Sequence, residues 1–302
     1  MTELLPVAPT RPLGMSGIVI SSIAWGMWRF AGEDVAAAAR LVNTVLDCGI
    51  ILLDTADVYG PDNGEPFGAA EALLGQVFAQ DSSLRARMVL ASKGGIVIGT
   101  PYDSSPPYIA EAIDASLRRL GTDHVDLWQI HRPDILTHPQ EVARALEDAH
   151  RAGKIRAIGV SNHTVPQIEA LRAFLTIPLV STQPEFSPLE LGPISSGELD
   201  QAMQHDLVVL AWSPLGGGRI GNPAPGRETE VAAALDRVAE TFGVSRTAAA
   251  YSWIMAHPAR PVPIIGSQRA ERIAEANDAY KVKWTRTAWY DVLVASRGEA
   301  LP

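Results

Sequence analysis

Residues 88–131 decide the fold, and they read MVLASKGGIVIGTPYDSSPPYIAEAIDASLRRLGTDHVDLWQIH. The two ends, Met88–Lys93 and Val125–His131, are short and largely apolar, as strands are when helices cover both faces of their sheet. Between them Pro106 suits the first position of a helix, apolar residues recur at helical spacing, and Gly121 supplies the stop. Strand, helix and strand in this order predict a βαβ unit with two parallel strands.

The same alternation runs from one end of the chain to the other. It predicts eight strands, at Ile23–Gly26, Ile50–Asp54, Met88–Lys93, Val125–His131, Ile155–Val160, Leu179–Gln183, Leu207–Trp212 and Val262–Ile265. Two helices, Glu230–Phe242 and Arg246–His257, precede the last strand. Eight such units in about 250 residues favour a closed α/β barrel, the (β/α)8 TIM barrel, over a doubly wound sheet. The Gly/Pro-rich Pro214–Gly226 follows a strand directly and reads as a loop at the barrel mouth, so residues 1–302 are expected to form a single domain.

Composition limits the function classes. The 302 residues carry a net charge of −9, which argues against nucleic acid or an anionic membrane as a partner. Cys48 is the only cysteine, which excludes intrachain disulfides and indicates a reducing compartment. The N-terminus lacks the apolar core of a signal peptide, and no uncharged apolar run reaches the roughly 20 residues that cross a bilayer. We therefore expect a cytoplasmic globular protein, monomeric or a small homo-oligomer, with no nucleic-acid or membrane partner.

Ionisable residues collect where the predicted strands end. A barrel holds its active site at the carboxyl ends of its strands. Here the second strand ends at Asp54 and continues to Tyr59, the third ends at Lys93, and the fourth ends at His131. Free tyrosine has a pKa near ~10, which a neighbouring lysine lowers, while a buried aspartate keeps that lysine charged and in place. Histidine can donate a hydrogen bond to a substrate oxygen or relay a proton. The set predicts an acid–base site with Tyr59 as the proton donor.

Seven short motifs, in order along the chain, carry a resemblance to a known family. They are RPLG (11–14), DTADVYG (54–60), SKGG (92–95), DLWQIHRPD (126–134), GKIRAIGVSN (153–162), AWSPLGGG (211–218) and PIIGSQRAERI (263–273). With these motifs the chain resembles the aldo-keto reductases, and its PLGGG and GSQRAERI segments look closest to the bacterial YdhF-like oxidoreductase subgroup. The resemblance implies a catalytic tetrad of Asp54, Tyr59, Lys93 and His131. It also implies reduction of a small-molecule carbonyl, with hydride delivered from nicotinamide C4 while Tyr59 protonates the oxygen.

The resemblance also implies where a nicotinamide cofactor binds, since the chain lacks the GxGxxG fingerprint of a Rossmann fold. Side chains after the fifth and sixth strands would hydrogen-bond the carboxamide, Trp212 would stack on the ring, and the backbone of Leu215–Arg219 would meet the pyrophosphate. Gly266, Ser267 and Arg272 would hold the 2′-phosphate. The full expected cofactor set is Gly26, Met27, Trp28, Asp54, Ser161, Asn162, Gln183, Trp212, Ser213, Pro214, Leu215, Gly216, Arg219, Gly266, Ser267, Arg269, Arg272 and Glu275. The expected substrate contacts are Trp28, Tyr59 and His131.

Position 266 departs from the family pattern, because many relatives carry lysine where Gly266 stands. Arg269 could compensate for the missing charge, or the preference for NADPH over NADH could be weakened. We expect NADP(H) as the preferred cofactor, with NAD(H) possible. Aromatic and apolar residues after the first strand, which are Trp25, Met27, Trp28 and Phe30, suggest a pocket rim that accepts an aromatic or aliphatic carbonyl.

Three other functions remain open on the sequence. The same site could run in reverse, as an NAD(P)+-dependent dehydrogenase of an aldose or another hydroxy compound. The chain could also be a cofactor-binding regulatory subunit with little turnover, as some relatives of the family are. A metal-dependent hydrolase that uses Asp54, Asp57 and His131 is the weakest, because the spacing of a metal site is missing and Lys93 would repel a divalent ion. No metal is therefore expected.

Overall fold

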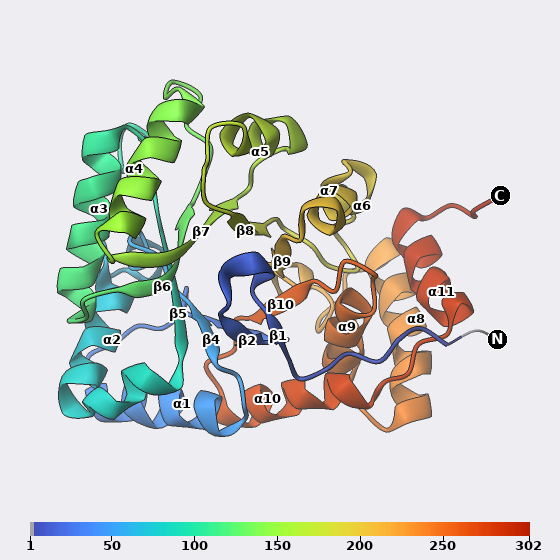
Figure 1. The fold of residues 1–302 in the computed structure, drawn as a ribbon. Coiled ribbons are helices and arrows are strands. Elements are labelled where there is room, and N and C mark those ends of the chain that lie inside the picture. The colour runs from blue at the N-terminus through green and yellow to red at the C-terminus, as the bar shows by residue number, and fades with distance from the viewer. Residues whose placement is uncertain (1–2) are drawn as a thin grey trace.

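A computed structural model describes residues 3–302 and shows a closed barrel of eight parallel strands (Figure 1). The strands are β3 (Ala24–Gly26), β4 (Leu52–Asp54), β5 (Val89–Gly94), β6 (Val125–Ile130), β7 (Ile155–Ser161), β8 (Leu179–Gln183), β9 (Val208–Ala211) and β10 (Val262–Ile265). The last strand pairs with the first, with Ile264 opposite Ala24. The (β/α)8 prediction is confirmed, and the doubly wound alternative is wrong because an open sheet leaves its outer strands unpaired.

All eight predicted strands exist, but several are shorter than the apolar runs that predicted them. The run Ile50–Asp54 begins as a strand only at Leu52, and the run Leu207–Trp212 narrows to Val208–Ala211. Burial of a residue requires only that something covers it, whereas a strand also requires ladder hydrogen bonds with both neighbours. The ends of an apolar run therefore extend beyond the strand that it contains.

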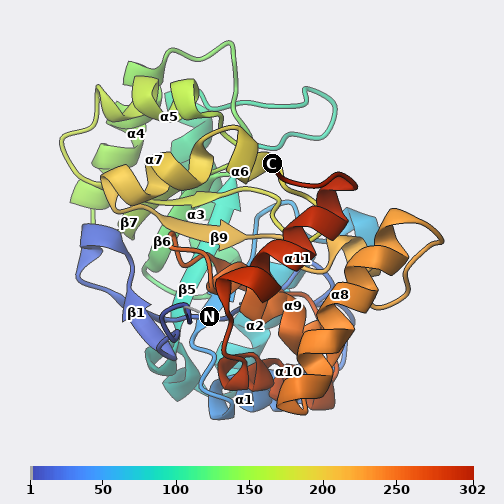
Figure 2. The same cartoon turned by 90° about the vertical axis from the view of Figure 1, so that its right-hand side faces the viewer.

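Helices surround the barrel and separate the strands (Figure 1). They are α1 (Val35–Asp47), α2 (Ala69–Gln80), α3 (Pro106–Leu120), α4 (Pro139–Arg151), α5 (Val165–Arg172), α6 (Gly192–Ser195), α7 (Glu198–His205), α8 (Arg227–Phe242), α9 (Arg246–Met255), α10 (Ala270–Glu275) and α11 (Arg286–Arg297). Helix α3 starts at Pro106 and ends before Gly121, which adopts the left-handed conformation with φ 63° as expected of a C-terminal glycine. The two helices predicted before the last strand are α8 and α9. Helices α8 and α11 pack against each other on one side of the molecule, where Figure 2 shows them together.

A hairpin that the sequence did not reveal closes the amino-terminal end of the barrel. Strands β1 (Thr10–Pro12) and β2 (Val19–Ser21) pair antiparallel, and Ser21 accepts the backbone N–H groups of Ile51 and Leu52 at the start of β4. Gly14 connects them with φ 48°, and a Cβ there would lie 2.7 Å from the carbonyl oxygen of Asp206. The glycine of the RPLG motif is therefore required by close backbone approach.

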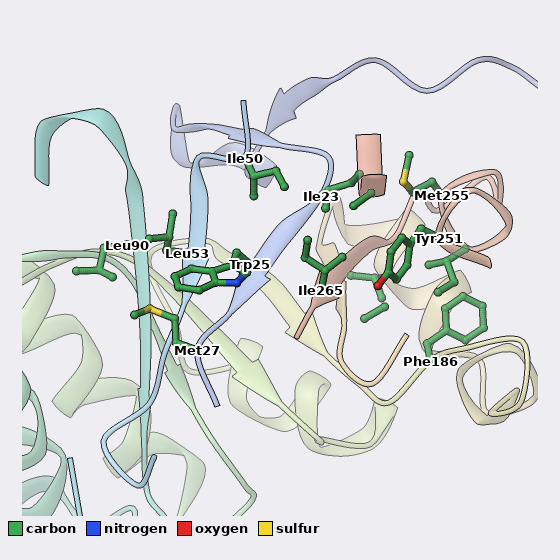
Figure 3. Close-up of a cluster of buried hydrophobic side chains, with 14 of the residues drawn as sticks. Ile23, Trp25, Met27, Ile50, Leu53, Leu90, Phe186, Tyr251, Met255 and Ile265 are labelled. Atoms are coloured by element: carbon green, nitrogen blue, oxygen red, sulfur yellow. The ribbon is translucent and has the colours of Figure 1, made fainter. Parts of the chain in front are cut away.

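Apolar side chains form two layers, one inside the barrel and one between the barrel and its helices. Inside, the hairpin residues Leu13, Ile18 and Ile20 complete a cluster with inward residues of the strands. Outside, side chains that alternate with these along the strands, such as Leu53, Leu90 and Ile265, pack beneath the helices; Figure 3 shows part of this layer. The two layers follow from the period of two along each strand. Across residues 3–302, no helix combines the length and the apolar character that a membrane crossing needs.

The hairpin gives a test of this packing. Ile20 is fully buried, and Ile20→Ala should lower the free energy of unfolding by about 3 kcal/mol, because it removes apolar contacts and leaves a cavity. Val19, its neighbour in β2, is 54% exposed, and Val19→Ala should cost less than about 1 kcal/mol. Urea denaturation of both variants measures the difference. Equal losses would show that the hairpin does not seal the barrel.

Candidate active site

Lys93 is the centre of the site, and its side chain is fully buried. Its ammonium donates to Oδ2 of Asp54 at 2.8 Å, to the carbonyl oxygen of Thr55 at 2.6 Å and to the hydroxyl of Tyr59 at 3.0 Å. Burial disfavours the cation, but the charge of Asp54 and the hydrogen bonds outweigh it and raise the pKa of Lys93. The lysine therefore stays charged inside the barrel.

Asp54 is held by the barrel on its second oxygen as well. Gln183 and Gln129 donate to Oδ1 at 3.1 and 3.3 Å. Gln129 was missed by the sequence reasoning, although a polar residue inside the apolar run of β6 is a signal that could have revealed it. Ser181 lies on the same inward face of β8 as Gln183, and its hydroxyl donates to the side-chain oxygen of Gln129 at 3.3 Å. Side chains from three strands, β5, β6 and β8, thus bind the carboxylate that β4 carries.

Tyr59 and His131 stand face to edge. Their ring centroids are 5.9 Å apart at 77°. Burial raises the pKa of Tyr59 more than Lys93 lowers it, so the phenol keeps its proton at neutral pH. Burial, followed by the charges of Lys93 and Arg132, lowers the pKa of His131 well below its usual range, so this ring is neutral. Its Nδ1 is buried and has no hydrogen-bond partner within residues 3–302.

Residues expected near the nicotinamide lie in one hydrogen-bonded chain at the ends of β7, β8 and β9. Ser161 donates to the carbonyl oxygen of Gln183 at 2.8 Å, and the amide of Asn162 donates to Ser161 Oγ at 2.8 Å. The indole of Trp212 donates to Oδ1 of Asn162 at 3.0 Å. The fold therefore brings these four together, beside the carboxylate of Asp54.

The segment after β9 folds as a tight loop in which Gly216, Gly217 and Gly218 all have positive φ. The hydroxyl of Ser213 accepts the N–H of Gly217 at 3.1 Å, and Pro214, Leu215 and Gly216 lie between them. Arg219 bonds the carbonyl oxygen of Gly216 at 2.7 Å and pairs with Glu228 at 3.0 Å. Its charge is therefore partly balanced within the loop.

The residues expected at the 2′-phosphate follow β10, and the β3–α1 loop packs against them. The indole of Trp25 donates to the carbonyl oxygen of Ser267 at 2.9 Å, and Gln268 donates to that of Gly26 at 3.3 Å. Arg269 is paired with Glu271 at 2.6 Å. Arg272 is exposed on α10, and Glu275, the last residue of that helix, is half-buried.

Arg29 is a residue that the sequence reasoning missed at this place. A Cβ built on Gly266 would have the guanidinium of Arg29 as its nearest neighbour, at 3.7 Å. Arg29 is exposed and stacks on the ring of Trp28, 4.8 Å from its centroid. A cation thus faces the space beside the bare glycine, so the described residues fit an anionic cofactor there.

The expected apolar pocket rim is wrong for three of its four residues. Trp25 and Met27 are fully buried and Phe30 nearly so, and Figure 3 shows Trp25 and Met27 in the core near Leu53 and Leu90. Trp25 points outward from β3 by the alternation of the strand, and the short loop after β3 turns Met27 and Phe30 under the helices. Only Trp28 is exposed, at 43%, and its indole donates to Asp62 at 3.0 Å.

A closed barrel with tyrosine, lysine, aspartate and histidine at its strand ends is an enzyme architecture, and the relatives of this chain define the class as oxidoreductase. The model of the Aldo/keto reductase family matches residues 22–292, so the chain belongs to that family. The 6-dehydroglucose reductase of Novosphingobium aromaticivorans is 60% identical over 301 residues, 99% of each chain. Oxidoreductase YdhF of Escherichia coli is 35% identical and covers all of both chains, which confirms the subgroup.

The structural comparison agrees with the family. The glycerol dehydrogenase of Gluconobacter oxydans superposes with a TM-score of 0.84 at 27% identity, over 97% of this chain and 98% of that one.

Within residues 3–302, no three or more histidine, cysteine, aspartate or glutamate side chains gather as a metal site would require.

A second buried histidine next to the site allows a test by pH. Nδ1 of His163 must donate to the carbonyl oxygen of Ser161 at 2.8 Å, and burial lowers the pKa of His163 to about 4. The unfolded chain has a pKa near ~6.5, so it binds a proton that the folded protein refuses, and stability falls as the pH drops between these values.

Between about pH 7.5 and about pH 5, His163 should cost the folded protein about 2 kcal/mol. His163→Gln removes this titration, whereas His131 titrates in both proteins. Urea denaturation at the two pH values should therefore show a smaller loss for the variant. Identical losses would mean that His163 is not the buried neutral group.

Proposed function

We propose that this enzyme reduces aldehydes or ketones to alcohols with NADPH and that Tyr59 is the general acid. The observation that carries the proposal is the buried chain from Asp54 through Lys93 to the hydroxyl of Tyr59, at 2.8 and 3.0 Å. A phenol next to a fixed ammonium can release its proton and have the resulting anion stabilised. No other tyrosine hydroxyl in the described residues bonds an ammonium.

The chain's own residues divide the work of protonation. Tyr59 holds the proton until charge develops on the substrate oxygen, and Lys93 then stabilises the tyrosinate that remains. The neutral ring of His131, 5.9 Å from that of Tyr59, can donate one N–H to the same oxygen. Asp54, held by two glutamines, keeps Lys93 charged and in place. A bound nicotinamide supplies the hydride.

The substrate class follows from the relatives. A protein named 6-dehydroglucose reductase is 60% identical to this chain, and a second of that name in Agrobacterium fabrum is 35% identical. We infer that a sugar carrying an aldehyde is the substrate to test first. The structure offers only Trp28 of the apolar rim, which agrees with a hydrophilic substrate better than with an aromatic one.

The reverse reaction is the second candidate, because a relative of known structure is named a glycerol dehydrogenase. The same four residues serve oxidation when Tyr59 accepts the proton. Comparison of turnover with NADPH plus aldehyde and with NADP+ plus polyol separates the two directions. Tight cofactor binding without turnover in either direction would favour the regulatory subunit.

Tyr59→Phe tests the general acid. Loss of the hydroxyl should lower kcat at least about 100-fold, the usual scale of acid catalysis, while the dissociation constant of NADPH changes little. Tyr251→Phe is the matched control, since Tyr251 is a buried tyrosine of α9. It should leave kcat within about threefold. Near-normal turnover of Tyr59→Phe would exclude Tyr59 as the acid.

We also propose that Arg29 supplies the charge that the family pattern places at position 266, and that it binds the 2′-phosphate of NADPH together with Ser267 and Arg272. Arg269 is a poorer candidate than the sequence indicated, because Glu271 already pairs with it. Within residues 3–302 Arg29 has no such ion pair, and it faces the space at Gly266.

Arg29→Gln should weaken NADPH binding at least about tenfold and change NADH binding little, because a charged hydrogen bond to the phosphate is worth roughly 1.5–3 kcal/mol. Titration of tryptophan fluorescence with each cofactor measures both constants. Arg269→Gln is the control and should alter neither by more than about twofold. Equal weakening of NADPH and NADH would contradict a 2′-phosphate contact.

A further inference from the structure

Asp57 lies within the catalytic segment but takes no part in the tetrad. It stands three residues after Asp54 and two before Tyr59, and it is only 1% exposed. Both of its carboxyl oxygens are buried and have no hydrogen-bond partner within the described residues. Its backbone N–H donates to the carbonyl oxygen of Lys93 at 2.9 Å. The fold therefore fixes the backbone of Asp57 beside that of Lys93.

The carboxyl of Asp57 packs against the backbone of Gly94, where a side chain would leave no room for it. A Cβ on Gly94 would come within 2.9 Å of Asp57 Oδ2 and 2.7 Å of Cζ2 of Trp128. Any larger residue at position 94 would displace one of the two. The walls on this side, a bare backbone and an indole, offer Asp57 little solvation.

The cations near Asp57 do not balance the negative charge that it would carry if ionised. Glu71 of α2 is fully buried, accepts from Ser92 at 2.5 Å and pairs with Arg119 of α3 at 2.7 Å. Arg119 is thus bound to Glu71, and Lys93 is bound to Asp54.

The other titratable groups that face Asp57 are Tyr59 and Tyr108, both neutral at pH 7. Burial, and next the like charge of Glu71, raise the pKa of Asp57 to about 8, against smaller opposing effects of Arg119, the backbone N–H of Val58, which lies near the carboxyl without meeting hydrogen-bond geometry, and Lys93. At neutral pH this carboxyl holds its proton.

We propose that Asp57 is a protonated positioning residue of the active site, whose ionisation makes Tyr59 a weaker acid and sets the alkaline limit of turnover. The proposal rests on the proposed role of Tyr59. As a neutral acid, Asp57 leaves the charge of Lys93 to Asp54 and Tyr59. As an anion, it adds a second carboxylate to the buried surroundings of Tyr59, and its charge raises the pKa of Tyr59. Its proton goes to solvent and takes no part in the turnover itself.

Asp57→Asn is the direct test, because the amide has the shape of the neutral acid and cannot ionise. At about pH 6.5 its kcat should lie within about threefold of the wild type. Above about pH 8 the wild type should lose activity, while the variant should keep it until a limb at least about one pH unit higher. An unchanged alkaline limb would overturn the proposal. So would a folded variant whose kcat at pH 6.5 falls more than about tenfold, since the charged form would then be the working one.

Glu71→Gln provides a shift in the opposite direction. It removes the like charge and frees Arg119, so Asp57 should ionise more easily and the alkaline limb should move to lower pH. In the double variant with Asp57→Asn this shift should vanish, because Asp57, the group through which Glu71 acts, no longer titrates. A purely structural effect of Glu71 would persist in the double variant and would count against the proposal.

Infrared spectroscopy tests the protonation state without activity. The wild type at pH 6.5 should show the C=O stretch of a buried carboxylic acid that is absent from Asp57→Asn and disappears at pH 10. Absence of that band overturns the proposal even if Glu71→Gln fails to fold. An active Tyr59→Phe variant would exclude Tyr59 as the acid and with it the effect of Asp57 on Tyr59, whereas the infrared band would still report the protonation of Asp57. Inactive Tyr59→Phe with an unshifted Asp57→Asn profile defeats only the role of Asp57.

Discussion

The ammonium of Lys93 is the constraint around which this barrel is arranged. A fully buried cation is tolerated only where partners surround it, and removal of one partner from a buried pair typically costs about 3–5 kcal/mol. Here the partners are the carboxylate of Asp54, a backbone carbonyl and the phenol of Tyr59. They come from the end of β4 and the loop after it, while Lys93 comes from β5. The lysine therefore has its hydrogen-bond partners only when β4 and β5 are paired.

The constraint extends around the barrel through Asp54. Its second oxygen is bound by Gln129 on β6 and Gln183 on β8, so strands on opposite sides of β7 contact the same carboxylate. The amino-terminal half of the barrel interior has the opposite character, because the hairpin fills it with Leu13, Ile18 and Ile20. One end of the barrel is thus apolar and closed, and the other collects charge. This polarity lets a stable core and a reactive site share eight short strands.

The sequence was sufficient for the barrel because its parallel strands are buried on both faces and appear as apolar runs. It was also sufficient for the position of the tetrad, since the residues that end adjacent strands must meet at one rim. It was insufficient where a contact depends on the direction of a side chain. Arg29 follows a strand end like its neighbours, yet only the packing of its loop against the segment after β10 brings it to Gly266. The expected rim residues Met27 and Phe30 failed for the same reason, because a run of apolar residues does not say which way the loop turns.

The hairpin was missed for a different reason. Its strands are three residues each, and one of them contains Pro12, so local propensity carries almost no signal there. What stabilises it is the barrel end that it covers, which only the closed fold creates. Tertiary contact thus decides the local structure. The same holds for Gln129, whose buried amide has a hydrogen-bond partner only because the fold places Asp54 beside it.

Beside the site, three carboxyl groups and two cations share one buried region. Asp54 forms an ion pair with Lys93 at 2.8 Å, and Glu71 forms one with Arg119 at 2.7 Å. Asp57 is left with neither, and its oxygens have no partner in the described part of the chain. A region with little solvent tolerates net charge poorly. Two cations balance two carboxylates only if the third carboxyl carries a proton. The neutral state of Asp57 is therefore required by the pairing of its neighbours, and its loss at high pH would place one unbalanced negative charge next to the tyrosine.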